Sequence, residues 1–153
     1  MSRIRRYPIG RVGIVAASVA LALGGCGDSG PIAAPSPAPS GARTIEIEAE
    51  DALRFDPPEL TVTAGETIHF IVSNTGGSDH EFILGDAGVQ AAHAEGDGHG
   101  AHGSDEALAG LDLPPGATET ATVTFEEPGT ILFGCHIDGH YSAGMVGTIT
   151  VEG

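Results

Sequence analysis

Along most of the chain, hydrophobic and polar residues alternate with a period of two, which is typical of strands that bury one face. Ile45 and Ile47, for example, alternate with Glu46 and Glu48. The pattern predicts eight short strands, at about 45–48, 53–55, 60–62, 68–72, 82–84, 118–125, 131–133 and 148–151. Turn residues separate these runs, and no segment shows sustained helical periodicity. We therefore predict an all-β domain, built as an antiparallel sandwich or barrel.

One segment, residues 86–106, interrupts the alternation. It consists largely of Gly and Ala, with five acidic residues, no Lys or Arg, and three histidines, His93, His99 and His102. A loop of this length inside a compact domain is either functional or disordered, so we expect a flexible, His-rich insertion. Two interpretations stand. The histidines bind Cu(II) or Zn(II) weakly and load or buffer a main site, or the segment is a solvated low-complexity insertion.

The beginning of the chain predicts a targeting signal. An Arg-rich start precedes an apolar run over residues 12–23, which is shorter than the roughly 20 residues that span a bilayer. We therefore interpret residues 1–25 as a secretory signal peptide. The run Leu23-Gly24-Gly25-Cys26 resembles the lipobox of bacterial lipoproteins, which implies cleavage before Cys26 and lipidation of that residue. The alternative is an ordinary signal peptide with an unrelated Cys.

A tether and one domain follow the signal. Residues 26–43 are rich in Pro, Ala and Ser and show no hydrophobic period, so they predict an extended spacer. Residues 44–153 are enough for one modest core. Together these segments predict a domain outside the cytoplasm, anchored to the cell membrane by lipid.

The folded part of the chain is strongly acidic. All 21 acidic residues lie beyond Cys26, where only Arg43 and Arg54 are basic, and this gives that part a formal charge of −19 with His neutral. Such a field repels nucleic acid and favours partners with cationic docking surfaces. The alternative is that the charge serves only solubility.

Cys135 is the centre of the strongest motif. If Cys26 carries lipid, Cys135 has no disulfide partner, and binding a metal protects an unpaired thiol outside the cell. Cys135, His140 and Met145 follow the spacing C-x4-H-x4-M, and His80 lies 55 residues upstream of the Cys. One thiolate, two imidazoles and a distant thioether make the blue-copper ligand pattern. A zinc site is the alternative, but Met is a poor zinc ligand and structural zinc sites usually take four Cys or His.

These four residues, in this order and between these strands, resemble the copper site of the cupredoxin family, whose rusticyanin and auracyanin members share the C-x4-H-x4-M loop. The resemblance covers residues 44–151. It includes three further runs, Leu60-Thr61-Val62-Thr63-Ala64-Gly65-Glu66-Thr67, Asn74-Thr75-Gly76 and Gly147-Thr148-Ile149-Thr150-Val151. It implies a single Greek-key β-sandwich of seven or eight strands, with one copper per chain that cycles between Cu(I) and Cu(II).

The resemblance also implies where electrons pass. In the family the C-terminal His ligand, His140 in this chain, emerges through an apolar surface patch, with Ala143 and Val146 nearby. Many members carry Asn directly after the first His ligand, whereas this chain has Glu81. We therefore expect the contacts that brace the ligands to differ from those members. A backbone carbonyl of Asp79 as an additional axial ligand stays open.

Two other histidines are interpreted as non-ligands. His136 follows Cys135, but the chain has no His-x-His pairs to complete a second copper cluster, so we expect His136 to face away from the metal. His69 alternates with Ile68 and Phe70, so we expect it to face solvent or the other side of its sheet.

Two functions of different class fit this ligand set. One is a one-electron carrier that shuttles between redox partner proteins, and the other is a copper-handling protein that stores or delivers the ion. The axial Met and a single buried site favour the carrier, whereas the His-rich segment favours handling. We do not expect an enzyme, because the sequence offers no second metal site and no acid–base constellation beside the copper. We expect a monomer.

Overall fold

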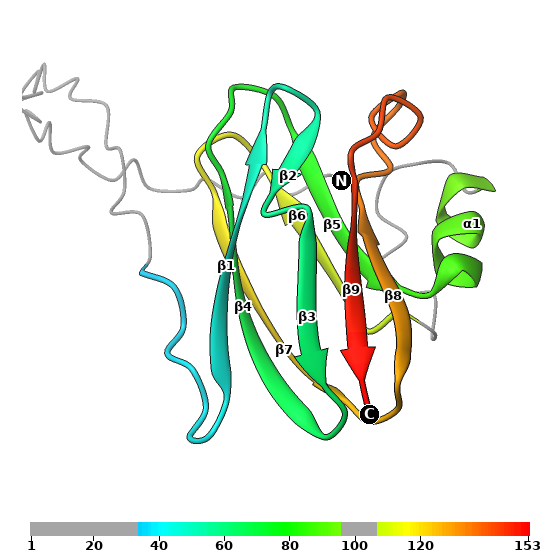
Figure 1. Ribbon diagram of the computed structural model, residues 1–153. Helices are drawn as coiled ribbons and strands as arrows, with labels where there is room; N and C mark the ends of the chain where they lie inside the picture. Colours follow the sequence, from blue (N-terminus) through cyan, green and yellow to red (C-terminus); the bar gives the residue numbers. More distant parts are fainter. Residues whose placement is uncertain (1–33, 96–106) are drawn as a thin grey trace, which may run out of the picture. The chain divides into compact units, whose positions relative to one another are not determined.

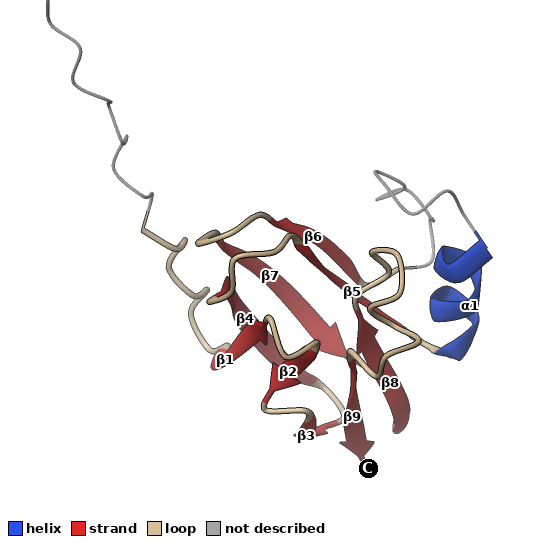
Figure 2. Ribbon diagram, turned by 90° about the horizontal axis from the view of Figure 1, so that it is seen from above, coloured by secondary structure: helices blue, strands red, loops and turns tan. Residues whose placement is uncertain are grey.

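The computed structural model describes residues 34–95 and 107–153, which form a β-sandwich with one short helix (Figure 1; Figure 2). Three residues of interest, Cys26, His99 and His102, lie outside the described residues, so the signal peptide and the lipid anchor stay predictions. A membrane-spanning helix, with its long apolar run, is not found among residues 34–95 and 107–153.

Nine strands make two sheets in the described part of the chain. The first sheet has the order β2-β1-β4-β7. Its members are β1 (Arg43–Glu50), β2 (Arg54–Asp56), β4 (Glu66–Asn74) and β7 (Thr118–Phe125). The second sheet has the order β3-β9-β8-β5-β6. Its members are β3 (Glu59–Thr63), β5 (His80–Gly85), β6 (Ala109–Leu113), β8 (Gly129–Gly134) and β9 (Val146–Glu152).

The eight strands predicted from the alternation are confirmed, and β6 was missed although Leu111 and Leu113 alternate with polar positions. The expectation of a purely antiparallel sandwich is wrong for two pairs, because β1 runs parallel to β4 and β3 runs parallel to β9. In both pairs, the chain crosses to the other sheet after the first strand and returns before the second. The hydrophobic alternation carries no information about strand direction, which depends on these crossovers.

Part of the segment expected to be a loop is helical. Helix α1 spans Ala87–Glu95, and its described neighbours are β5 and β8. Asp86 caps the helix, because its carboxylate accepts a hydrogen bond from the Val89 N–H at 2.9 Å. Four of the nine helical residues are Ala, the strongest helix former. Only Val89 and Gln90 are buried, which is why no helical hydrophobic period was visible.

Four buried aromatic rings form the centre of the core between the sheets: Phe55, Phe70, Phe82 and Phe133. The ring centroid of Phe82 lies 5.4 Å from that of Phe133 and 5.9 Å from that of Phe70. Because side chains alternate along a strand, Phe82 shares a face with His80 and Phe133 shares a face with Cys135. The core therefore continues into the first two predicted ligands.

The loop that precedes His80 is tied down from two sides. The Asp51 carboxylate accepts hydrogen bonds from the backbone N–H groups of Gly77, at 2.9 and 3.0 Å, and Ser78, at 3.1 Å. The buried Asn74 side chain donates to the carbonyl oxygens of Ser78 and Leu113, both at 2.7 Å. These contacts fix the backbone where β5 begins.

Gly147 is expected to tolerate no side chain. A Cβ at this position would lie 2.1 Å from Phe133 Cζ and 2.7 Å from the Pro58 carbonyl oxygen. Because a packed ring and a backbone group cannot both move aside, Gly147→Ala should lower the free energy of unfolding by roughly 1–3 kcal/mol, measured by urea unfolding. Gly129→Ala on the neighbouring strand is the control, because a Cβ there meets nothing within 4 Å. Equal stability of the two variants would contradict this account of the packing.

Asp51 is expected to make stability depend on pH. Hydrogen bonds from Gly77 and then Ser78 hold the pKa of Asp51 below its usual value. A carboxylate with a depressed folded-state pKa stabilises the protein fully above its unfolded pKa, about 3.9, and loses this effect as the pH falls through the folded pKa. Urea unfolding of the copper-free protein should therefore show a gap between wild type and Asp51→Asn at pH 6 that narrows towards pH 3. A gap that stays constant over this range would contradict the assignment.

Candidate metal centre

His80, Cys135 and His140 come together at one end of the sandwich, where β5 begins and the loop from β8 to β9 lies (Figure 1). The Cys135 Sγ atom lies 3.3 Å from His140 Nδ1 and 4.0 Å from His80 Nδ1. One ligand atom from each residue lies within 4.8 Å of the other two. For metal–ligand bonds of about 2.0–2.3 Å, a sulfur and a nitrogen on one ion lie roughly 3.5–3.8 Å apart. The observed distances bracket this range, so the three atoms could bind one ion.

The group is largely withdrawn from solvent. Cys135 and Met145 are fully buried and His80 is 1 % exposed, whereas His140 is half-buried. The Cys135 N–H donates to the Met145 carbonyl oxygen at 3.1 Å, which brings the thioether residue beside the thiol residue. The structure therefore collects all four predicted ligand residues at one place, three of them inside the core.

Backbone hydrogen bonds close the loop that carries three of these residues. The Met145 N–H donates to the His140 carbonyl oxygen at 3.0 Å, and the His140 N–H donates to that of Ile137 at 2.9 Å. Gly139 and Gly144 have φ values of 85° and 103°, in the left-handed region that favours glycine. The two glycines thus allow the backbone to turn tightly between Cys135 and Met145.

The electrostatics of the group suit a soft cation. Burial raises the pKa of the Cys135 thiol, and the backbone N–H groups of Glu81 and Ile137 partly oppose this rise. The Glu81 N–H lies 3.3 Å from Sγ, so it would also stabilise a bound thiolate. Burial, followed by the nearby His140, lowers the pKa of His80. The lowered pKa favours the neutral form of His80, which can donate a lone pair, and a bound metal would displace the proton of the Cys135 thiol.

The other histidines behave mostly as predicted. His136 points away from the group, with Nε2 at 2.8 Å from Gln90 Oε1. His69 lies on the far side of its sheet, where Nδ1 is 2.9 Å from Thr122 Oγ1, but Ser36 covers it, so it does not face solvent. His93 lies on α1, outside the group. The interpretation that it binds metal together with His99 and His102 is not tested by the described residues.

The donor set fits copper better than zinc. Two imidazole nitrogens and one sulfur around a common point, with a buried Met beside them, are typical of type 1 copper sites. Within residues 34–95 and 107–153, no other group of three or more His, Cys or acidic side chains lies close enough to bind an ion.

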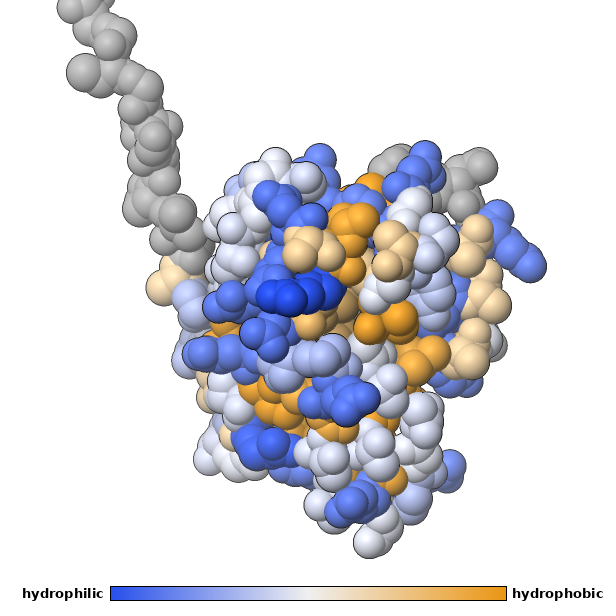
Figure 3. Space-filling model, turned by 45° about the horizontal axis from the view of Figure 1, so that its top comes forward, coloured by the Kyte–Doolittle hydropathy of each residue, from blue (hydrophilic) through white to orange (hydrophobic). Residues whose placement is uncertain are grey.

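The surface beside the group combines acidic and apolar residues. A hollow of about 330 Å³ borders His80 and is lined by Asp79, His80, Glu81, Asp112, Leu113, Pro114 and Ile137. Figure 3, which brings this end of the sandwich forward, shows apolar side chains among hydrophilic ones. The hollow beside His80 therefore presents both acidic and apolar side chains.

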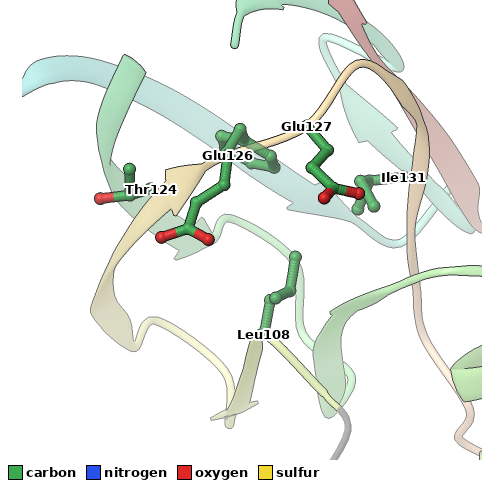
Figure 4. A pocket seen from close by; sticks show the side chains of 6 residues that line it. Leu108, Thr124, Glu126, Glu127 and Ile131 are labelled. Carbon is green, nitrogen blue, oxygen red and sulfur yellow. The ribbon is translucent and has the colours of Figure 1, made fainter. Parts of the chain in front are cut away.

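A second hollow is remote from the group. It has a volume of about 290 Å³ and is lined by Leu108, Thr124, Phe125, Glu126, Glu127 and Ile131. Figure 4 shows Leu108 across from the carboxylates of Glu126 and Glu127. Ile131 lies near the start of β8, whereas Cys135 follows the end of that strand. The hollow therefore takes no part in the candidate centre.

Replacing one sulfur should abolish the colour of the copper protein. A Cu(II)–thiolate bond gives a type 1 site its intense visible absorption, so Cys135→Ser loaded with Cu(II) should lose that absorption and its characteristic EPR spectrum. Cys26→Ser is the matched control, because it changes the other Cys of the chain and should keep the wild-type spectrum. Retention of the colour by Cys135→Ser would exclude Cys135 as the ligand.

Comparisons with known proteins agree with this geometry. Residues 42–152 match the family model described as copper binding proteins of the plastocyanin/azurin family. The chain is 35% identical over 132 residues to the copper-resistant cuproprotein CopI of Rubrivivax gelatinosus, covering 80% of this chain and 74% of that protein. It is 35% identical to CopI of Pseudomonas aeruginosa over 147 residues, covering 77% and 81% of the two chains.

Solved structures give the same result. Dithionite-reduced auracyanin from Roseiflexus castenholzii superposes with a TM-score of 0.64 at 33% identity, covering 74% of this chain and all of that one. Auracyanin A from Chloroflexus aurantiacus superposes with a TM-score of 0.63 at 30% identity, over 73% of this chain and all of that one. With a family match across the whole sandwich and cupredoxins among its structural neighbours, this chain belongs to the plastocyanin/azurin family of copper-binding proteins.

Proposed function

We propose that this protein is a type 1 copper protein that carries single electrons outside the cytoplasmic membrane. The proposal rests on one observation: the Cys135 sulfur lies 3.3 Å from a ring nitrogen of His140 and 4.0 Å from a ring nitrogen of His80. Paired strands and a hydrogen-bonded loop hold these three residues in place. Cu(I) favours few, soft ligands, whereas Cu(II) favours a tetragonal field, and a rigid near-trigonal set is intermediate. Because little has to move when the oxidation state changes, such a centre exchanges electrons rapidly.

Each of the four proposed ligands has a distinct role. Cys135 supplies the negative, soft donor, and His80 links the loop to the neighbouring strand β5. Met145 supplies a weak axial thioether. His140, the one half-buried member, supplies the route for electrons between the copper and a partner at the surface.

The partner we propose is a redox protein with a cationic docking surface. Beyond Cys26 the chain carries two basic and 21 acidic residues, and Asp79, Glu81 and Asp112 line the hollow beside His80. Opposite charge speeds encounter and orients the partner, while the apolar groups near His140 allow close approach. We further propose a monomer with a lipidated Cys26, tethered outside the cell membrane by residues 26–43, and no catalytic activity of its own.

Copper handling is the second candidate function. It is favoured by the relatives named copper-resistant cuproproteins, at 35% identity, and by the histidines of residues 86–106. In this role the centre would store the ion or pass it to another protein, and His93, His99 and His102 would load it. The same four ligands serve both functions, so the two differ in how firmly the copper is held.

A pair of measurements on the copper-loaded protein separates the two functions. For a carrier we expect a reversible one-electron wave in protein-film voltammetry, and retention of copper in excess EDTA. For a handler we expect copper to pass readily to the chelator. Rapid loss of copper together with an irreversible electrode response would contradict the carrier.

The three histidines of residues 86–106 allow a second test of copper handling. A variant with His93, His99 and His102 replaced by Ala should bind fewer Cu(II) ions in isothermal titration if these residues load copper. An unchanged stoichiometry would exclude a loading role and leave the carrier as the simpler function. The wild-type visible spectrum serves as the control that the main centre is intact.

A further inference from the structure

Helix α1 carries a buried glutamine that contacts three separate parts of the chain near the copper end. Gln90 is 3 % exposed. Its Nε2 donates to the carbonyl oxygens of Ile83, at 2.9 Å, and Leu132, at 3.3 Å, on strands β5 and β8. Its Oε1 lies 2.8 Å from Nε2 of His136. The Gln90 side chain thus links β5, which begins at His80, and β8, which ends just before Cys135. It also links both strands to His136, the residue that follows Cys135.

These contacts determine the proton positions. Two carbonyl oxygens accept only, so the Gln90 nitrogen must face them and Oε1 must face His136. Because Oε1 is an acceptor, the His136 Nε2 must carry the proton and donate it. The His136 side chain is 8 % exposed, so this hydrogen bond is shielded from water.

His136 in turn contacts a second residue of the loop between β8 and β9. Its ring stacks on that of Tyr141, with centroids 4.6 Å apart and planes 15° apart. Tyr141 directly follows His140, just as His136 directly follows Cys135. The pair therefore connects the residues next to two of the proposed ligands.

Gln90 and Tyr141 both pack closely against Gly134. A Cβ on Gly134 would lie 2.6 Å from Tyr141 Cε2 and 2.7 Å from Gln90 Oε1. Both side chains thus rest on the backbone directly before Cys135. The backbone on either side of the sulfur-bearing residue is in contact with this set of side chains.

We propose that Gln90 is a positioning residue of the copper centre, which acts through His136 and Tyr141 to hold the backbone beside Cys135 and His140. None of the three side chains is a proposed ligand. The helix that interrupts the strand alternation thereby braces the ligand loop from outside the sandwich. The inference concerns the geometry of the centre, so it holds whether the protein carries electrons or handles copper.

The test is Gln90→Leu, which keeps the approximate volume and removes all three hydrogen bonds. We expect one copper per chain, as in wild type, but an altered Cu(II) EPR spectrum. We also expect the electron self-exchange rate to fall by about tenfold, the lower end of the loss in activity when a contact that orients a metal ligand is removed. NMR of the diamagnetic Cu(I) protein should also show loss of the protected Nε2 proton of His136. His136→Phe, which keeps a ring for Tyr141, should produce the same changes in EPR and rate.

A double-mutant cycle tests whether Gln90 acts through His136. Gln90→Leu combined with His136→Phe should slow self-exchange no more than either change alone, because both remove the same link. Val89→Ala is the matched control, since it removes packing of α1 on Gly85 and keeps the hydrogen bonds of Gln90. It should lower the thermal midpoint and leave the EPR spectrum and self-exchange rate unchanged.

Two outcomes would overturn the proposal. One is a Gln90→Leu protein with a lowered thermal midpoint but wild-type EPR spectrum and self-exchange rate, which would make Gln90 a purely structural residue. The other is additive slowing in the double variant. If Gln90→Leu fails to fold, an unaltered EPR spectrum and rate in His136→Phe overturns the proposal equally.

Discussion

The copper centre depends on the antiparallel pairing of β5 with β8. In this register Ile83 faces Gly134 and Leu84 faces Phe133, so the first residues of β5 extend past the end of β8, beside the loop that follows it. Side chains alternate along both strands, and the inward positions that hold Phe82 and Phe133 in the core also direct His80 and Cys135 inward. His80 and Cys135 thus belong to the core and lie at the end of it that is nearest the ligand loop. A shift of one residue in either strand would turn its ligand outward.

The rest of the centre is held by contacts around this pair. Hydrogen bonds from Asp51 and Asn74 fix the loop before His80, and backbone hydrogen bonds close the loop from Cys135 to Met145. Gln90 adds a link from α1 to both strands. These contacts lie on different sides of the centre, so the ligand atoms are restrained in several directions. Such restraint suits an ion that must change oxidation state with little change in geometry.

The surroundings of the centre make access selective. Three of the four proposed ligands are buried, and the fourth, His140, is half-buried. Acidic side chains line the hollow beside His80 in a chain that is strongly acidic overall. A cationic partner of the kind proposed would therefore meet acidic side chains beside His80. The same burial slows the exchange of copper with solvent, which is an advantage to a carrier and a constraint on a copper-handling protein.

Eight of the nine strands, the order of the ligands and the choice of metal could be predicted from the sequence, because strand alternation and donor chemistry are local properties. C-x4-H-x4-M, with one His upstream, specified the four residues, and the left-handed Gly139 and Gly144 fit that spacing. The two parallel strand pairs and the role of α1 could not be predicted, because both depend on how distant segments pack in the folded chain. Strand direction depends on crossovers between sheets, which leave no periodic signal. Gln90 resembles any polar helical residue, and it becomes a brace because folding brings it to His136, 46 residues away.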